Sequence, residues 1–166
     1  LSIVPMLAMG NAMSTFTAQN MGAGKIDRVK EGYRMCYVIV LTAGAGLCVM
    51  YQLAGGAFVS LFLDSGSSEA YSVGLSYVKF LSFFYSFIGL KASTDGLLRG
   101  AGDVTAFTVA NLVNLAIRVS VTNLFAPIYG IQVAWMAVPL GWAANYVISF
   151  GWYLTGKWKK VRVIKK

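Results

Sequence analysis

The sequence predicts an all-α integral membrane protein with about five transmembrane helices. Three observations support this class: long apolar stretches, a low charge content, and basic residues concentrated in alternate connections. Of the 166 residues, 57% are hydrophobic and 12% are charged, whereas a soluble domain carries about 25% charged residues. So few charges could not cover the surface of a water-soluble protein of this length.

A helix needs about 20 apolar residues to cross a bilayer, and five stretches of the chain approach this length. We expect spans at about residues 1–20, 33–54, 79–98, 104–125 and 128–154. A short amphipathic stretch at 68–77 precedes the third span, and a basic tail at 156–166 follows the last. Because the chain starts inside an apolar stretch without a signal-peptide pattern, we expect it to be part of a longer protein.

Basic residues fall in alternate connections between these spans. The predicted loop after the first span contains Lys25, Arg28, Lys30 and Arg34, and Arg99 follows the third span. The connection after the second span is acidic, the one after the fourth has no base, and the tail is strongly basic. Since cytoplasmic loops are rich in Lys and Arg, we predict a cell-membrane protein with a cytoplasmic C-terminus. This distribution differs from the basic stripe of a nucleic-acid-binding surface, so no nucleic-acid partner is expected.

Polar residues inside the first span form two neighbouring faces. One face consists of small residues that would let another helix approach closely. Its members are Gly10, Ser14, Ala18 and Gly22. The adjacent face carries Asn11, Thr15 and Gln19. These three residues either hydrogen-bond to neighbouring helices or form the polar wall of a water-filled cavity.

The third span contains charged residues at helical spacing. Lys91, Asp95 and Arg99 recur every four residues and therefore lie along one face. If Arg99 marks the cytoplasmic boundary, Asp95 lies about 6 Å deeper and Lys91 about 12 Å deeper. Charge at that depth is costly unless it is paired or hydrated. The Lys91–Asp95 pair is either structural or part of a proton- or cation-responsive site with Asp95 as the responding group.

The fourth and fifth spans also contain polar faces. Asn111, Asn114 and Arg118 share one side of the fourth span, and Arg118 should face the bundle interior with a partner on another helix. Asp103 precedes this span and suits a helix N-cap. In the fifth span, Trp142 and Asn145 lie on one face, together with Ser149 and Trp152. These aromatic residues either contact a cationic substrate or serve in packing and as an interfacial anchor.

No catalytic constellation is recognisable. The chain has no His, and the segment GAGK at residues 22–25 lacks the spacing of a phosphate-binding loop. We therefore expect no enzymatic activity, no metal site and no cofactor. Energy for any transport would have to come from an ion gradient or from another subunit.

Two segments resemble a known family. AMSTFTAQNMGAGKIDRVKEGYR at residues 12–34 is one of them, and LLRGAGDV at 97–104, followed by NLAIR and YGIQVAW, is the other. Together they resemble the C-terminal half of multidrug and toxic compound extrusion (MATE) transporters. The first segment is similar to the end of the family's eighth helix and the loop that follows it. The second is similar to the connection between the tenth and eleventh helices.

The resemblance implies one incomplete lobe of a twelve-helix, two-lobe transporter, with the N-terminal lobe absent. It further implies antiport that exchanges Na⁺ or H⁺ for cationic or amphipathic drugs, by rocking of the two lobes. The expected partners are membrane lipid, these substrates and the missing lobe. Asp95 is the ion-coupling candidate. The cavity or substrate candidates are Asn11, Thr15, Gln19, Lys91, Asn111, Asn114, Arg118, Trp142 and Asn145.

Two alternatives remain open. A flippase of the same broad superfamily would move lipid-linked saccharides and would favour a long cationic groove open to lipid. A membrane subunit without transport activity would instead anchor or assemble a partner.

Overall fold

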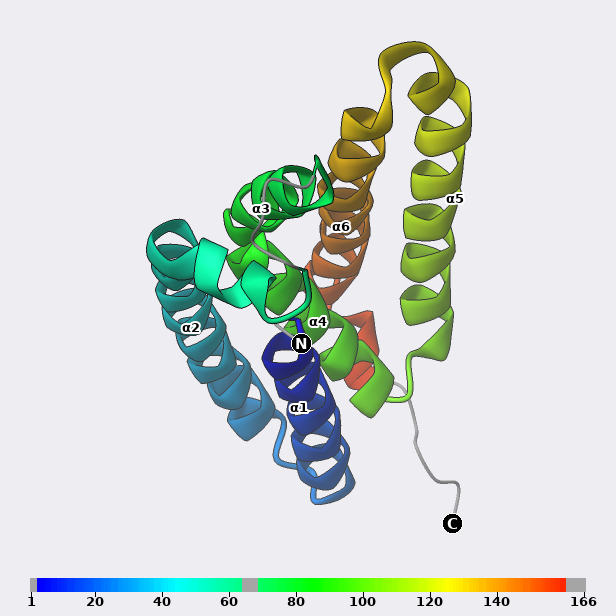
Figure 1. Cartoon of the computed structure of the whole chain (residues 1–166). Helices are drawn as coiled ribbons and strands as arrows, with labels where there is room; N and C mark the ends of the chain where they lie inside the picture. The colour runs from blue at the N-terminus through cyan, green and yellow to red at the C-terminus, as the bar shows by residue number, and fades with distance from the viewer. Residues whose placement is uncertain (1–2, 64–68, 161–166) are drawn as a thin grey trace.

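The computed structural model describes residues 3–63 and 69–160, which are almost entirely helical (Figure 1). Six α-helices and a short 3-10 helix follow one another along this part of the chain. They are α1 (Val4–Gly22), α2 (Ile26–Ser60), α3 (Glu69–Ser82), α4 (Tyr85–Gly100), α5 (Val104–Tyr129), α6 (Ile131–Leu154) and η1 (Lys157–Lys160). The described residues contain no strand, so the all-α prediction is confirmed. Residue 68 and residues 161–166, which belong to the predicted amphipathic stretch and basic tail, lie outside the described part.

Helix α4 lies in the middle of the bundle. It packs against α1, α2 and α6, and less extensively against α5, which packs mainly on α6 (Figure 1). Every residue from 92 to 98 is buried as a result. Because protein surrounds this part of α4, its polar side chains need partners on the neighbouring helices.

Glycines bring α1 and α4 into close contact. A Cβ added to Gly10 would lie 2.6 Å from the carbonyl oxygen of Ala92. A Cβ on Gly96 would clash with the Gly10 carbonyl, and one on Gly100 with the Ser14 carbonyl. The predicted stripe of small residues therefore meets α4 at Gly10 and Ser14. Farther along α1, Gly22 has open space around it.

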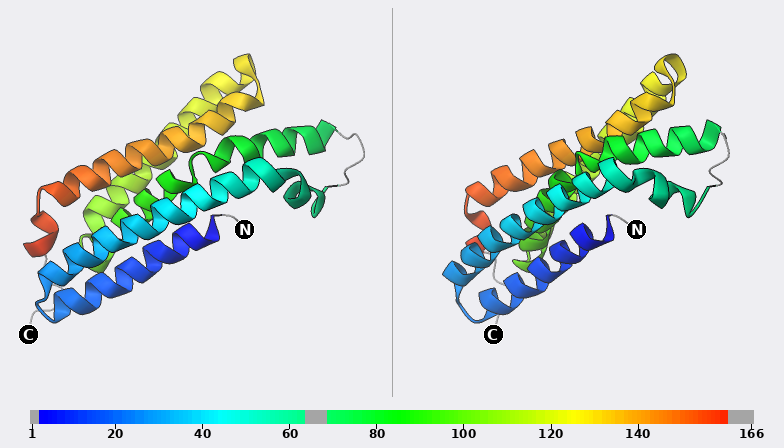
Figure 2. Two further views of the ribbon diagram at one scale, coloured as in Figure 1. Left: turned by 90° about the vertical axis from the view of Figure 1, so that its left-hand side faces the viewer. Right: turned by 60° about the vertical axis from the view of Figure 1, so that its left-hand side comes forward.

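The basic connections lie at one end of the bundle. The turn between α1 and α2 and the end of α6 are at this end, whereas the α5–α6 turn lies at the other (Figure 2). Gly130, with φ of 82°, makes the α5–α6 turn a single-residue connection. The alternation seen in the sequence thus corresponds to two ends of the folded molecule.

The first basic segment is helical, so the prediction that it forms a loop is wrong. Helix α2 starts at Ile26 and includes Arg28, Lys30 and Arg34 in its first turns. Asp27 stabilises this start by its place in the first turn and by a 2.7 Å ion pair with Lys30. Hydropathy marks only the apolar part of a helix, whereas α2 continues into charged turns at this end.

The third predicted span, residues 79–98, is wrong as a single helix. Helix α3 ends at Ser82, α4 begins at Tyr85, and the two helix axes differ in direction by 56°. Gln52 of α2 stabilises the break, because its side-chain amide donates to the Lys79 carbonyl at 2.9 Å. The same carbonyl also accepts from the Ser82 hydroxyl at 2.7 Å. These bonds satisfy a carbonyl group near the end of α3.

Within the described part, α2, α5 and α6 are long and apolar enough to cross a membrane. Helices α3 and α4 meet the same requirement together, as a broken span. The predicted spans at 104–125 and 128–154 agree with α5 and α6 to within a few residues. Helix α1 has 19 residues and is not among these candidates, so a crossing at residues 1–20 stays a prediction. The apolar helices indicate a membrane protein.

Candidate functional site

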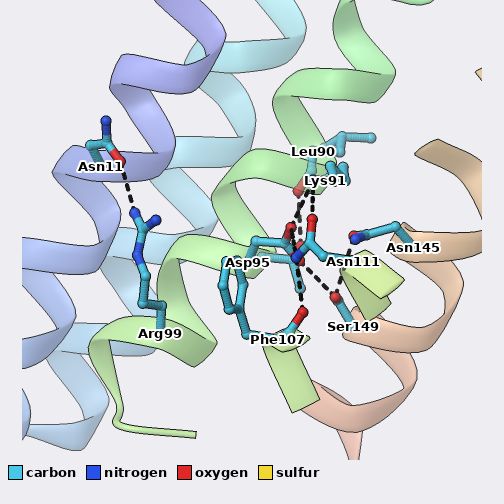
Figure 3. A network of polar contacts seen from close by, with 10 residues as sticks. Asn11, Leu90, Lys91, Asp95, Arg99, Phe107, Asn111, Asn145 and Ser149 are labelled. Atoms are coloured by element: carbon cyan, nitrogen blue, oxygen red, sulfur yellow. Dashed lines mark hydrogen bonds and ion pairs between the residues drawn. The ribbon is translucent and has the colours of Figure 1, made fainter. Parts of the chain in front are cut away.

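A polar cluster around Asp95 joins three helices (Figure 3). One carboxylate oxygen of Asp95, on α4, accepts from the Lys91 ammonium at 2.9 Å and from the Asn111 amide of α5 at 3.2 Å. The other oxygen accepts from the Ser149 hydroxyl of α6 at 2.7 Å. The predicted Lys91–Asp95 pair is therefore present, and its carboxylate also connects α4 to both α5 and α6.

Lys91 and Asn111 hydrogen-bond to each other as well as to the Asp95 carboxylate. The Lys91 ammonium donates to the side-chain oxygen of Asn111 at 3.0 Å. The Asn111 amide also donates to the backbone carbonyl of Phe107 at 2.8 Å, which fixes its orientation. Lys91, Asp95 and Asn111 thus form a closed triangle of charge-assisted hydrogen bonds.

The cluster is enclosed but borders a cavity. The exposed fractions of the Lys91 and Asp95 side chains are 14% and 7%, respectively. A cavity of about 260 Å³ between α1, α4 and α5 reaches both of them, together with Asn11 and Arg99. A small ion or water molecule in this cavity would meet a buried carboxylate and several polar side chains.

Arg99 is directed toward α1 and does not pair with Asp95. Its guanidinium donates to the side-chain oxygen of Asn11 at 2.8 Å and to the Ser14 hydroxyl at 3.3 Å (Figure 3). It also lies 5.7 Å from the centre of the Phe107 ring of α5. The polar face of α1 therefore hydrogen-bonds to α4 at Asn11.

The other two polar residues of the α1 face point outward. Thr15 and Gln19 are both exposed, and the Thr15 hydroxyl donates to the Asn11 carbonyl at 3.3 Å. Among the described residues, no side chain of another helix hydrogen-bonds to either of them. The structure therefore leaves them on an exposed face of α1, one and two turns beyond Asn11.

Asn114 and Arg118 lie apart from the Asp95 cluster. Asn114 and the aliphatic part of Arg118 pack against Gly141, where α5 and α6 come close together. Arg118 also lines a separate cavity of about 430 Å³. Arg118 is exposed, and among the described residues it has no ion pair or hydrogen bond. The expected partner on another helix is thus not found in this part of the chain.

The aromatic and amide residues of α6 differ in their surroundings. Trp142 is buried in the apolar core, which favours a packing role. Asn145 is buried beside Ser149, and its side-chain oxygen lies 3.4 Å from the Ser149 hydroxyl. The sequence places Ser149 on this face but does not single it out as a site residue. Its position one turn after Asn145 was the available signal.

Asp103 caps α5, as predicted. Its side chain accepts from the backbone N–H of Ala106 at 3.3 Å. Its second oxygen accepts from the indole N–H of Trp152 at 2.6 Å, a contact not expected from sequence. Trp152 therefore connects the end of α6 to the start of α5, and the Lys157 ammonium lies 5.0 Å from its ring centre.

A second polar cluster, formed by hydroxyl groups and not predicted from the sequence, lies where α2, α4 and α6 meet. The Thr94 hydroxyl is 2.7 Å from that of Tyr33 and 2.8 Å from that of Tyr37, and the two tyrosine hydroxyls contact each other. Tyr37 also donates to Tyr146 of α6 at 3.3 Å. Helix α4 is consequently bonded through Thr94 to α2 and through the neighbouring Asp95 to α5 and α6.

Comparison with known proteins gives a family and two relatives. The MatE family model matches residues 1–138. The "Probable multidrug resistance protein YpnP" of Bacillus subtilis (strain 168) is 27% identical over 161 residues, which are 96% of this chain and 36% of the relative. The "Probable multidrug resistance protein YoeA" of the same organism is 22% identical over 165 residues, covering 98% of this chain and 35% of the relative. The chain thus spans about a third of the length of these relatives. No solved structure gives a significant match.

Proposed function

Because the chain belongs to the MatE family, we propose that it forms part of a membrane exporter of cationic or amphipathic compounds, driven by Na⁺ or H⁺ entry. Both curated relatives are named as probable multidrug resistance proteins, which supports export of toxic compounds. The apolar helices place the chain in a membrane, where substrate and ion must pass between protein surfaces. In this proposal the cell membrane is its location, and the α1–α2 turn and the C-terminus are cytoplasmic.

The observation that carries the proposal is the buried Asp95 carboxylate. It borders a cavity and holds α4, α5 and α6 together through Lys91, Asn111 and Ser149. An ionisable residue inside a membrane bundle is costly, and such residues mark ion and proton pathways. Asp95 is therefore the residue through which ion binding would change the packing of these three helices.

Loading of Asp95 with a cation would act by neutralising its negative charge. A protonated carboxyl no longer attracts the Lys91 ammonium as an ion partner, and it can no longer accept every bond that it accepts as a carboxylate. The connection between α4 and its two neighbours then weakens. Unloading restores the bonds, so the two charge states favour two arrangements of the helices, as an alternating-access exporter requires.

The exposed polar face of α1 suits a substrate pathway. Thr15 and Gln19 are exposed on this chain, and Asn11 borders the Asp95 cavity. A cationic compound beside this face would be close to the residues that respond to the ion. The surface that closes the pathway is assigned in this proposal to the N-terminal lobe of the full-length transporter.

The test is gradient-driven efflux by the full-length transporter carrying Asp95→Asn. We expect efflux of a fluorescent cationic compound to fall to the level of cells without the transporter, while the protein still inserts in the membrane. Asp27→Asn is the matched control, because Asp27 is exposed at the start of α2 and should leave efflux unchanged. Unchanged efflux by Asp95→Asn would remove Asp95 from the mechanism.

Loss of folding must be separated from loss of coupling. Removing one partner of a buried ion pair costs about 3–5 kcal/mol, because the other charge is left unpaired. If Asp95→Asn inserts poorly because Lys91 is left unpaired, the double variant Asp95→Asn/Lys91→Met, which removes both charges, should insert normally. If the double variant also recovers gradient-driven efflux, Asp95 is only structural.

A further inference from the structure

Lys91 occupies an unusual position within the Asp95 cluster. Its ammonium lies between two oxygen atoms, 2.9 Å from an Asp95 carboxylate oxygen and 3.0 Å from the Asn111 side-chain oxygen. The ammonium comes from the turn of α4 that precedes Asp95, so it is part of the same rigid element. Figure 3 shows Lys91 reaching the same point as Asp95 and Asn111.

Carboxylate and amide oxygens are also the ligands of hard metal cations, which bind oxygen donors from side chains, backbone and water. A metal ion at Asp95 would need the same two oxygens that Lys91 contacts. The remaining Asp95 oxygen already accepts from Ser149 at 2.7 Å. The Lys91 ammonium therefore places positive charge at the position that a bound metal cation would occupy.

We propose that the Lys91 ammonium is a resident cation that excludes Na⁺ from Asp95. This inference rests on the proposed function, because it assumes that Asp95 is the ion-responsive group, and it adds a residue that determines ion selectivity.

The charges near Asp95 support this assignment. On α4 itself the charged neighbours are Lys91 and Arg99, and Arg99 is engaged by Asn11 and Ser14 of α1. Helix α5 presents the neutral Asn111, with Arg118 two turns farther along, and α6 presents the neutral Ser149 and Asn145. Within the described residues, Lys91 is the ion-pair partner of Asp95.

The experiment compares melting temperatures of the full-length transporter in detergent, in NaCl and in choline chloride of equal ionic strength. Lys91→Met removes the resident charge but retains an apolar chain of similar length. We expect this variant to gain Na⁺-specific stabilisation over the wild type, on the order of 1–2 °C at ten times the dissociation constant for a transporter of the relatives' length. The gain should disappear in Lys91→Met/Asp95→Asn, because that variant lacks the carboxylate.

Two further variants make the result decisive. Lys79→Met removes another partly buried lysine, on α3, and should respond to Na⁺ as the wild type does. Lys91→Gln removes the charge but keeps a hydrogen-bonding side chain, so it replaces Lys91→Met if that variant does not fold. An unchanged Na⁺ response in the folded Lys91 variant would overturn the inference, as would a gain that persists without Asp95. Melting requires no transport, so this result is independent of the efflux test of Asp95.

Discussion

Two buried carboxylates each hydrogen-bond to side chains of neighbouring helices. Both are buried: Asp95 connects α4 to α5 and α6, and Asp103 connects the start of α5 to the end of α6. Both accept hydrogen bonds at each of their oxygens. In a bundle whose surface is largely apolar, such polar contacts determine which helix faces meet, because unpaired polar groups are costly there.

Trp152→Phe tests the second of these connections. The substitution removes the indole N–H that lies 2.6 Å from Asp103 and retains an aromatic ring. Because the acceptor is a carboxylate, we expect the free energy of unfolding to fall by about 1.5–3 kcal/mol. The measurement is equilibrium unfolding in detergent micelles.

Trp135→Phe is the matched control for this prediction. Trp135 packs against Tyr77 with ring centres 5.3 Å apart, and its indole N–H has no hydrogen-bond partner among the described residues. A similar loss of stability in both variants would show that the Asp103 bond contributes little.

At the scale of helices, close approach of α1 and α4 depends on glycine. Gly96 lies so close to the Gly10 carbonyl that a Cβ on Gly96 would clash with it. Because the clash would be with backbone atoms, it could not be relieved by a change of side-chain rotamer. Gly96→Ala should therefore separate the two helices and lower the free energy of unfolding by about 1–3 kcal/mol or more.

Gly151→Ala provides the comparison on another helix. Nothing lies within 4 Å of a Cβ at Gly151, on α6, so alanine should be neutral or slightly stabilising there through its helix propensity. Equilibrium unfolding of both variants measures the difference. Equal effects at the two positions would contradict a packing role for Gly96.

Local sequence patterns predicted part of the helices and of the site. Apolar stretches located α5 and α6, and the spacing of four residues between Lys91 and Asp95 predicted their contact. These features depend on short-range geometry. The break between α3 and α4 was not predictable in this way, because residues 83–84 are apolar and the bonds from Gln52 come from another helix.

The partners of Asp95 also divide into features that local spacing predicts and features that only helix packing determines. Helical spacing placed Asn111 and Asn145 on polar faces, but only packing decides that Asn111 and Ser149 reach the carboxylate while Arg118 does not. Arg99, spaced like a third member of the charged stack, bonds to α1 instead. Which residues meet across helices depends on the rotation and tilt of each helix, and a single sequence does not contain that information in its local periodicity.

At the scale of the whole molecule, the chain has one basic end and one end with few charges. The first end contains the α1–α2 turn, the C-terminal end of α4 and η1, and the second contains the α5–α6 turn (Figure 2). If the helices cross a bilayer, the basic end is expected on the cytoplasmic side. The direction in which ions and substrates would pass Asp95 in the proposed exporter depends on this topology.

Labelling of single cysteines from each side of intact cells tests this topology most directly. After replacement of Cys36 and Cys48, cysteines are introduced at the two ends as Ala23→Cys, Thr155→Cys, Leu61→Cys and Tyr129→Cys. An impermeant thiol reagent should label Leu61→Cys and Tyr129→Cys from outside, and should reach Ala23→Cys and Thr155→Cys only after the membrane is opened. Labelling of all four positions from outside, or of Ala23→Cys and Thr155→Cys alone, would contradict the account.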